Sequence, residues 1–172
     1  MHQFFICNQD KIESKLKTFI KTKTSDDGWT DYYRDKYSTD QWVLTRYDAA
    51  YQGGGISVLK RLPQLTTDEL IDVAMTSFDT NDVTGASIEL SERERSNKEN
   101  FRDKLLIRLL QVDTSNLTGF EKERLKIIIY ESDLYDPTNL RDIMGKHYDE
   151  IKKDAEYYQT ISQKAKDILS RL

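Results

Sequence analysis

Apolar residues recur along most of the chain at spacings of three and four, which is the period of an amphipathic helix. The first such stripe follows Asn8, a candidate N-cap, and predicts a helix that ends in a polar loop at Thr24 to Gly28. The lysines around this stripe occupy its polar side and its C-terminal end. The stripe contains Ile12, Leu16, Phe19 and Ile20.

Two residue pairs in the middle of the chain have the spacing of a helix capping box. Ser38 with Gln41 predicts a helix that runs to about Asp48, and Thr66 with Glu69 opens another. Between them, residues 56–62 are compatible with a short helix or a short strand, and Pro63 ends that element. The helix after Thr66 has an apolar stripe of Leu70, Ile71, Ala74, Met75 and Phe78.

The second half of the chain is patterned more regularly. Apolar stripes predict helices within residues 83–98, 101–110 and 121–131, and a long final helix over residues 148–172. Pro137 suits the first turn of one more helix, capped by Asp136, because proline lacks the N–H that is left without a partner there. That helix would turn Leu140, Ile143 and Met144 inward.

Seven or eight helices joined by short polar turns predict an all-α protein with a single helical domain over residues 1–172. Two arrangements fit this pattern equally, a compact bundle and a short HEAT-like stack of antiparallel helical hairpins. The helical segments share no repeated sequence that would decide between them. A small β-hairpin near residues 40–60 is the main way in which the all-α prediction would fail locally.

Composition places the chain among folded cytoplasmic proteins. Apolar residues make up 37% of the 172 positions and charged residues 33%, which leaves enough apolar surface for a core. The single Cys7 has no partner for a disulfide, and the N-terminus lacks the basic start and apolar run of a secretory signal. No stretch is long and apolar enough to cross a membrane. Cytoplasmic localisation is therefore expected.

The charge is acidic and unevenly distributed. The net charge of −4 argues against binding to nucleic acid, since that affinity comes mainly from Lys and Arg. From Leu62 to Glu92 the chain contains no Lys or Arg at all. This acidic block is either the solvated face of surface helices or a patch that attracts a cationic partner. Its acids are Asp68, Glu69, Asp72, Asp79, Asp82, Glu89 and Glu92.

Both tryptophans and several tyrosines are concentrated between Trp29 and Tyr51, next to a glycine triplet, Gly53 to Gly55. Aromatic side chains of this kind either fill a core or grip another protein. The glycines match neither a phosphate-binding P-loop nor a dinucleotide fingerprint, because the required neighbours are absent. They indicate a bend or a close approach of helices, a loop that contacts a partner, or an anion-binding nest of backbone N–H groups.

No residue pattern predicts a reaction. His2 and His147 stand apart from any nucleophile motif, and the His and Asp spacings of metal hydrolases are missing. Acidic residues are so frequent that carboxylate pairs carry no specificity. The sequence therefore predicts a non-catalytic protein without cofactor or metal.

The block from Trp29 to Glu94 resembles the small immunity proteins of bacterial polymorphic-toxin systems. The residues that carry the resemblance are Tyr51-Gln-Gly-Gly-Gly-Ile56, Leu59-Lys-Arg-Leu-Pro63, Leu65-Thr-Thr-Asp-Glu-Leu-Ile71 and Gly85-Ala-Ser. The resemblance implies a cytoplasmic antidote that binds the toxic domain of a cognate protein toxin, often a nuclease, and blocks its active site.

Under this hypothesis, carboxylates and aromatic rings would bind a basic cleft of the toxin. The competing hypotheses are a HEAT-like structural adaptor, a homo-oligomeric interaction protein and an enzyme with a pocket that converges on His147 or on several carboxylates. The sequence does not decide the oligomeric state. The candidate partner contacts are Trp42, Tyr47, Tyr51, Asp68, Asp72, Asp79 and Asp82.

Overall fold

In a computed structural model the chain divides into two compact units, residues 1–86 and 87–172. The structure describes residues 3–47 and 55–172. The first unit contains an antiparallel β-sheet and the second is helical, so the fold is mixed α/β. The prediction of an all-α bundle or HEAT-like stack is wrong. That residues 1–172 form one domain stays a prediction.

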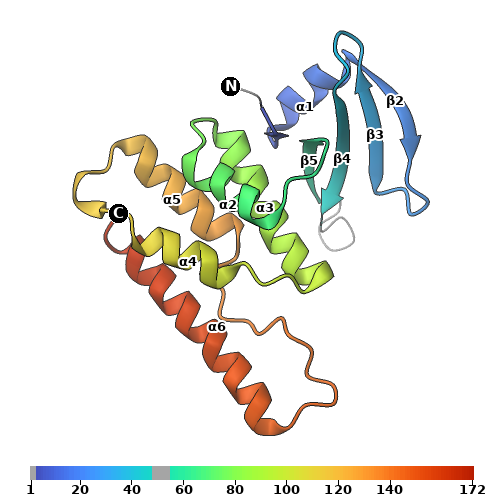
Figure 1. The fold of residues 1–172 in the computed structure, drawn as a ribbon. Helices are drawn as coiled ribbons and strands as arrows, with labels where there is room; N and C mark the ends of the chain where they lie inside the picture. Colours follow the sequence, from blue (N-terminus) through green and yellow to red (C-terminus); the bar gives the residue numbers. More distant parts are fainter. Residues whose placement is uncertain (1–2, 48–54) are drawn as a thin grey trace. The chain divides into compact units, whose positions relative to one another are not determined.

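Within the described residues, five strands form one antiparallel sheet in the order β1-β5-β4-β3-β2 (Figure 1). β4 and β5 pair from Trp42 opposite Arg61 to Tyr47 opposite Ile56. The all-α prediction thus fails where its local exception was named, near residues 40–60, but the hairpin there is part of a larger sheet. The strands are β1 (Phe5–Ile6), β2 (Phe19–Thr24), β3 (Thr30–Asp35), β4 (Gln41–Tyr47) and β5 (Ile56–Arg61).

The helix predicted from Ser38 to about Asp48 is absent. Ser38 lies in the turn between β3 and β4, where its Oγ accepts a hydrogen bond from the Asp40 N–H at 3.2 Å. Serine favours such turns for the same reason that it favours helix caps, because its hydroxyl binds nearby backbone groups. Trp42, Val43, Thr45 and Tyr47, which follow, are aromatic or β-branched and fit a strand better than a helix. The strand propensity of these residues outweighs the capping-box spacing of Ser38 and Gln41, which gave a wrong prediction.

Helix α1 (Gln9–Leu16) packs on one face of the sheet and closes a small core. Asn8 caps α1 as expected, its side chain accepting from the Lys11 N–H at 3.1 Å. The stripe predicted to continue in the same helix breaks, because Phe19 and Ile20 begin β2. The buried members of this core cluster are Ile6, Ile12, Phe19, Trp42, Leu44 and Leu59, with Leu16 and Tyr33 packed against it.

The predicted capping box of α2 (Thr67–Thr76) is confirmed. Thr66 accepts from the Glu69 N–H, and the Glu69 carboxylate accepts in return from the Thr66 N–H at 2.7 Å. Leu70, Ile71 and Ala74 are buried as expected. Phe78, which was assigned to the same apolar stripe, lies beyond the end of α2 and is 71% exposed.

Gly85 in α3 (Thr80–Asn97) allows the helix to approach β1 closely. An added Cβ at Gly85 would overlap the Cβ of Phe5, which is itself buried. This explains a glycine inside a helix, where it ordinarily costs about 0.5–1 kcal/mol relative to alanine.

Gly85→Ala is therefore expected to destabilise the protein by about 2 kcal/mol, in spite of the better helix propensity of alanine. Gly119→Ala is the matched control, since Gly119 starts a helix and has no neighbour within 4 Å of the added Cβ. It should be neutral or slightly stabilising. Urea unfolding of both variants measures the difference, and equal effects would contradict the close packing of Gly85 on Phe5.

The second unit contains the C-terminal part of α3 together with α4 (Arg102–Leu110), a 3-10 turn (Thr114–Asn116), α5 (Gly119–Glu131) and α6 (Tyr148–Leu169). These helices confirm the predictions for residues 83–131 and 148–172. Its buried apolar side chains come from all three later helices and include Leu105, Leu109, Leu125, Ile128, Ile161, Ala165 and Ile168.

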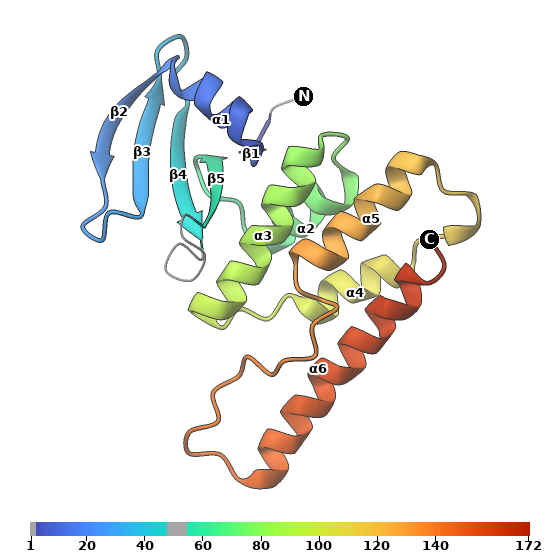
Figure 2. The same cartoon turned by 180° about the vertical axis from the view of Figure 1, so that it is seen from behind.

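The helix expected after Pro137 is absent. Residues 132–147 form a long irregular connection between α5 and α6 (Figure 2). Asp136 caps a turn here, with its Oδ1 accepting from the Thr138 N–H at 2.9 Å, and Asn139 accepts similarly from Arg141. Local side-chain bonds of this type compete with helix formation. Ile143 and Met144 are consequently 62% and 94% exposed and do not face inward.

Candidate partner-binding surfaces

Helix α2 presents carboxylates to solvent at the start of the acidic block. Asp68, Glu69 and Asp72 are all exposed, and the spacing of four places Asp68 and Asp72 on the same side of the helix. Hydrogen bonds from the Thr66 N–H and hydroxyl lower the pKa of Glu69, so its negative charge persists well below neutral pH. We call Asp68, Glu69 and Asp72 the α2 acidic surface.

The other two predicted acidic contacts have internal partners. Asp82 is 3% exposed, and one of its carboxylate oxygens accepts from the backbone N–H groups of Phe4 and Phe5 at 2.8 Å each. Asp79 accepts from the Gln3 side chain at 3.0 Å and from the Asn81 N–H at 2.9 Å. Both residues therefore attach the β1 segment to the start of α3. Neither adds to the α2 acidic surface.

Of the three predicted aromatic anchors, the structure describes Trp42 and Tyr47. Trp42 is 4% exposed and belongs to the core cluster, with its ring centroid 5.8 Å from that of Phe19. Tyr47 is half-buried, and its hydroxyl accepts from the Lys60 Nζ at 2.9 Å. Tyr51 lies outside the described residues, as do Gly53 and Gly54. The core interpretation of the aromatic segment thus holds for Trp42.

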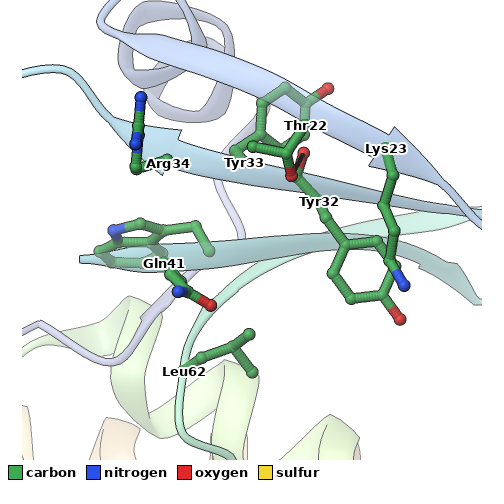
Figure 3. Close-up of a pocket in the computed structure, with 8 residues that line it drawn as sticks. Thr22, Lys23, Tyr32, Tyr33, Arg34, Gln41 and Leu62 are labelled. Carbon is green, nitrogen blue, oxygen red and sulfur yellow. Dashed lines mark hydrogen bonds between the residues drawn. The ribbon is translucent and has the colours of Figure 1, made fainter. Parts of the chain in front are cut away.

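A hollow crosses β2, β3 and β4 and is lined by residues of both sheet faces, including Trp42 of the core cluster and Tyr33, which packs against that cluster. Tyr32 and Arg34 share one face by strand alternation, Lys23 is paired with Tyr32, and Gln41 is paired with Arg34. In Figure 3 the Lys23 side chain runs beside the Tyr32 ring, with its Nζ 4.3 Å from the ring centroid. We call this hollow the sheet groove. It measures about 480 Å³ and is lined by Thr22, Lys23, Tyr32, Tyr33, Arg34, Gln41, Trp42 and Leu62.

A second cavity of about 490 Å³ shares Gln41 and Leu62 with the sheet groove and is completed by Thr39, Asp40 and Pro63. Sequence reasoning missed both hollows because it assigned residues 38–48 to a helix. The signal that could have corrected this assignment is the concentration of aromatic and β-branched residues between Thr30 and Tyr47, which favours strands over a helix.

The most deeply buried charges lie in the second unit. Arg102 is 1% exposed, and its Nε donates to both carboxylate oxygens of Glu94 at 2.7 and 2.9 Å. The Tyr158 hydroxyl donates to the same carboxylate at 3.0 Å, and burial together with Glu94 raises the pKa of Tyr158 to about 12. Each of these polar groups has partners inside the unit, which indicates a structural network.

The described residues offer no metal centre and no membrane span. Nowhere in residues 3–47 and 55–172 do three or more His, Cys, Asp or Glu side chains come together around a point that could hold a metal ion. In the same residues, no helix has both the length and the apolar composition needed to cross a bilayer. His147 precedes α6 as its exposed N-cap, and its N–H donates to Glu150 at 2.9 Å.

Comparisons of the chain with protein-family models, with curated proteins and with solved structures found no match.

Proposed function

We propose that this chain is a non-catalytic protein-binding module that neutralises a cognate bacterial toxin, and that the α2 acidic surface makes the main contact. The observation that carries the proposal is the set of exposed carboxylates Asp68, Glu69 and Asp72 in a stretch without Lys or Arg from Leu62 to Glu92. Carboxylates clustered on one helix face produce a negative potential that attracts a cationic partner.

A basic active-site cleft is the natural complement of this surface. Toxins that act on nucleic acid need positive clefts to hold phosphate groups, and an inhibitor with clustered carboxylates competes for the same charge. Opposite charges accelerate association, while buried apolar contacts slow dissociation. Phe78, 71% exposed and two residues beyond α2, is the apolar contact that we assign next to the acids. It takes the anchoring role first expected of the buried Trp42.

Co-expression in a bacterial host with the protein encoded by the adjacent gene tests the function. We expect the wild-type chain to restore growth when that protein is toxic, and Asp68→Lys/Asp72→Lys to lose most of the protection. The control Asp26→Lys/Glu123→Lys makes the same change in net charge at two exposed positions elsewhere and should still protect. Growth arrest that the wild-type chain cannot relieve would count against the proposed function.

A further inference from the structure

The sheet groove contains two cations, Lys23 and Arg34, that form no ion pair with any carboxylate in residues 3–47 and 55–172. On the sheet and α1, Lys15 pairs with Asp35, Lys21 and Arg46 pair with Asp31, and Arg61 pairs with Asp40. In contrast, no carboxylate among the described residues lies within ion-pairing distance of Lys23 or Arg34. Both side chains line the groove, and both residues are exposed.

The rest of the lining suits a peptide. Tyr32 and Leu62 supply apolar surface, and the Gln41 amide can donate to and accept from a backbone. The second cavity continues past Gln41 and Leu62 and adds Pro63. A ligand that fits both hollows has a negative charge next to Lys23 and Arg34. It also has an apolar side chain in the second cavity, beside Leu62 and Pro63. An extended polypeptide has this form, because its side chains project at regular intervals.

Charge favours this peptide ligand over two other candidate occupants of the groove, a nucleic acid and a second copy of the chain. Nucleic acid needs many phosphate contacts to bind well, and the groove has two unpaired cations in a chain of net charge −4. A second copy that paired along β2, the end strand of the sheet, would bring Lys21 and Lys23 close to the same lysines of its partner. Lysines on an edge strand oppose such pairing.

We infer that the sheet groove binds an extended, carboxylate-bearing segment of another protein. The carboxylate lies between Lys23 and Arg34, and a neighbouring apolar side chain of the segment packs on Tyr32 or enters the second cavity beside Leu62. This contact is separate from the α2 acidic surface. A test of peptide binding at the groove can therefore fail without contradicting the proposed toxin neutralisation, and the reverse also holds.

The test is an NMR titration of the full-length, ¹⁵N-labelled chain with a synthetic peptide of alternating Glu and Val. We expect saturable shifts of the amides of Lys23, Tyr32, Arg34 and Gln41. Lys23→Gln/Arg34→Gln should weaken binding about tenfold at low salt, as two partly exposed ion pairs are lost. Lys11→Gln/Lys17→Gln removes the same charge from exposed positions at α1 and should bind as the wild type does.

Three results would overturn the inference. The first is the absence of shifts at the groove, and the second is an equal loss of affinity in both double variants, which would indicate attraction by net charge alone. The third is tighter binding at the groove of an oligothymidylate of matched charge, which would assign the site to nucleic acid. Circular dichroism and an unchanged amide spectrum outside the groove confirm that each variant is folded, so that a loss of binding is a loss of contact.

Discussion

Arg102→Ala is expected to lower the free energy of unfolding by about 3–5 kcal/mol, the largest effect that we predict. The substitution leaves Glu94, which is 5% exposed, as a buried carboxylate without its cation. It also removes the N–H donor that Arg102 offers to the Asp133 carbonyl at 2.9 Å. That bond ties the start of α4 to the residues that follow α5, so the loss affects several elements of the second unit.

A double-mutant cycle separates the ion pair from simple loss of packing. Glu94→Ala/Arg102→Ala should cost at least about 1 kcal/mol less than the sum of the single variants, because neither charge is then left alone. The control Lys152→Ala removes the exposed pair with Glu156 in α6 and should cost less than about 0.5 kcal/mol. Thermal or urea unfolding provides the values. Additive single effects would contradict the coupling that the geometry indicates.

Asp82→Ala is expected to cost about 3 kcal/mol, because it leaves the Phe4 and Phe5 N–H groups without their acceptor. Asp82→Asn is the matched variant, since its side-chain oxygen can accept the same bonds. At neutral pH it should cost less than about 1 kcal/mol. Unfolding of both variants in urea measures the contrast, and an equal loss in both would show that the negative charge, and not the acceptor, is what the site requires.

The comparison of Asp82→Asn with the wild type should also depend on pH. Burial raises the pKa of Asp82 above its ordinary 3.8, against the lowering effect of the Phe5 and Phe4 N–H groups. A carboxyl group with a raised pKa in the folded state stabilises the fold most at pH values below 3.8, and that contribution is lost as pH rises through the folded-state pKa. The stability of Asp82→Asn relative to the wild type should therefore increase from acidic to neutral pH. A relative stability that falls over this range would contradict the raised pKa.

Helices with side-chain caps and regular apolar stripes were predictable from the sequence. The Thr66 and Glu69 capping box is formed, and the stripes of residues 101–110 and 121–131 are helices. Such helices are specified locally, because the cap and the apolar face lie within a few residues of each other. A short local pattern can also occur outside helices. Ser38 has the spacing of a capping box with Gln41 but lies in the turn before β4.

The sheet was not predictable from helical periodicity because its pairings join distant residues. Phe5 pairs with Lys60 across most of the first unit, and no local pattern specifies that register. The register of β2 against β3 shifts between Lys21, which pairs with Tyr33, and Lys23, which pairs with Tyr32, and this irregularity disturbs the strand alternation. The groove depends on these pairings, so Lys23, Tyr32 and Arg34 could not be grouped before the topology was known.

The position of the acidic block was predictable from the sequence, but the exposure of its carboxylates was not, for a related reason. Composition identified the block from Leu62 to Glu92 but not which carboxylates reach solvent. Asp68 and Asp72 are on the outer side of α2, whereas Asp82 is buried by β1, a segment almost eighty residues earlier in the chain. Burial by a distant segment is a property of the fold, and the sequence near Asp82 does not show it.

Calorimetric titration of the purified chain with the protein encoded by the adjacent gene tests the proposed function most directly. The account predicts a complex at micromolar concentration or below, an affinity about tenfold weaker in high salt, and a comparable loss for Asp68→Asn/Asp72→Asn but not for Asp26→Asn/Glu123→Gln. No complex at low salt, or a complex indifferent to Asp68 and Asp72, would contradict it.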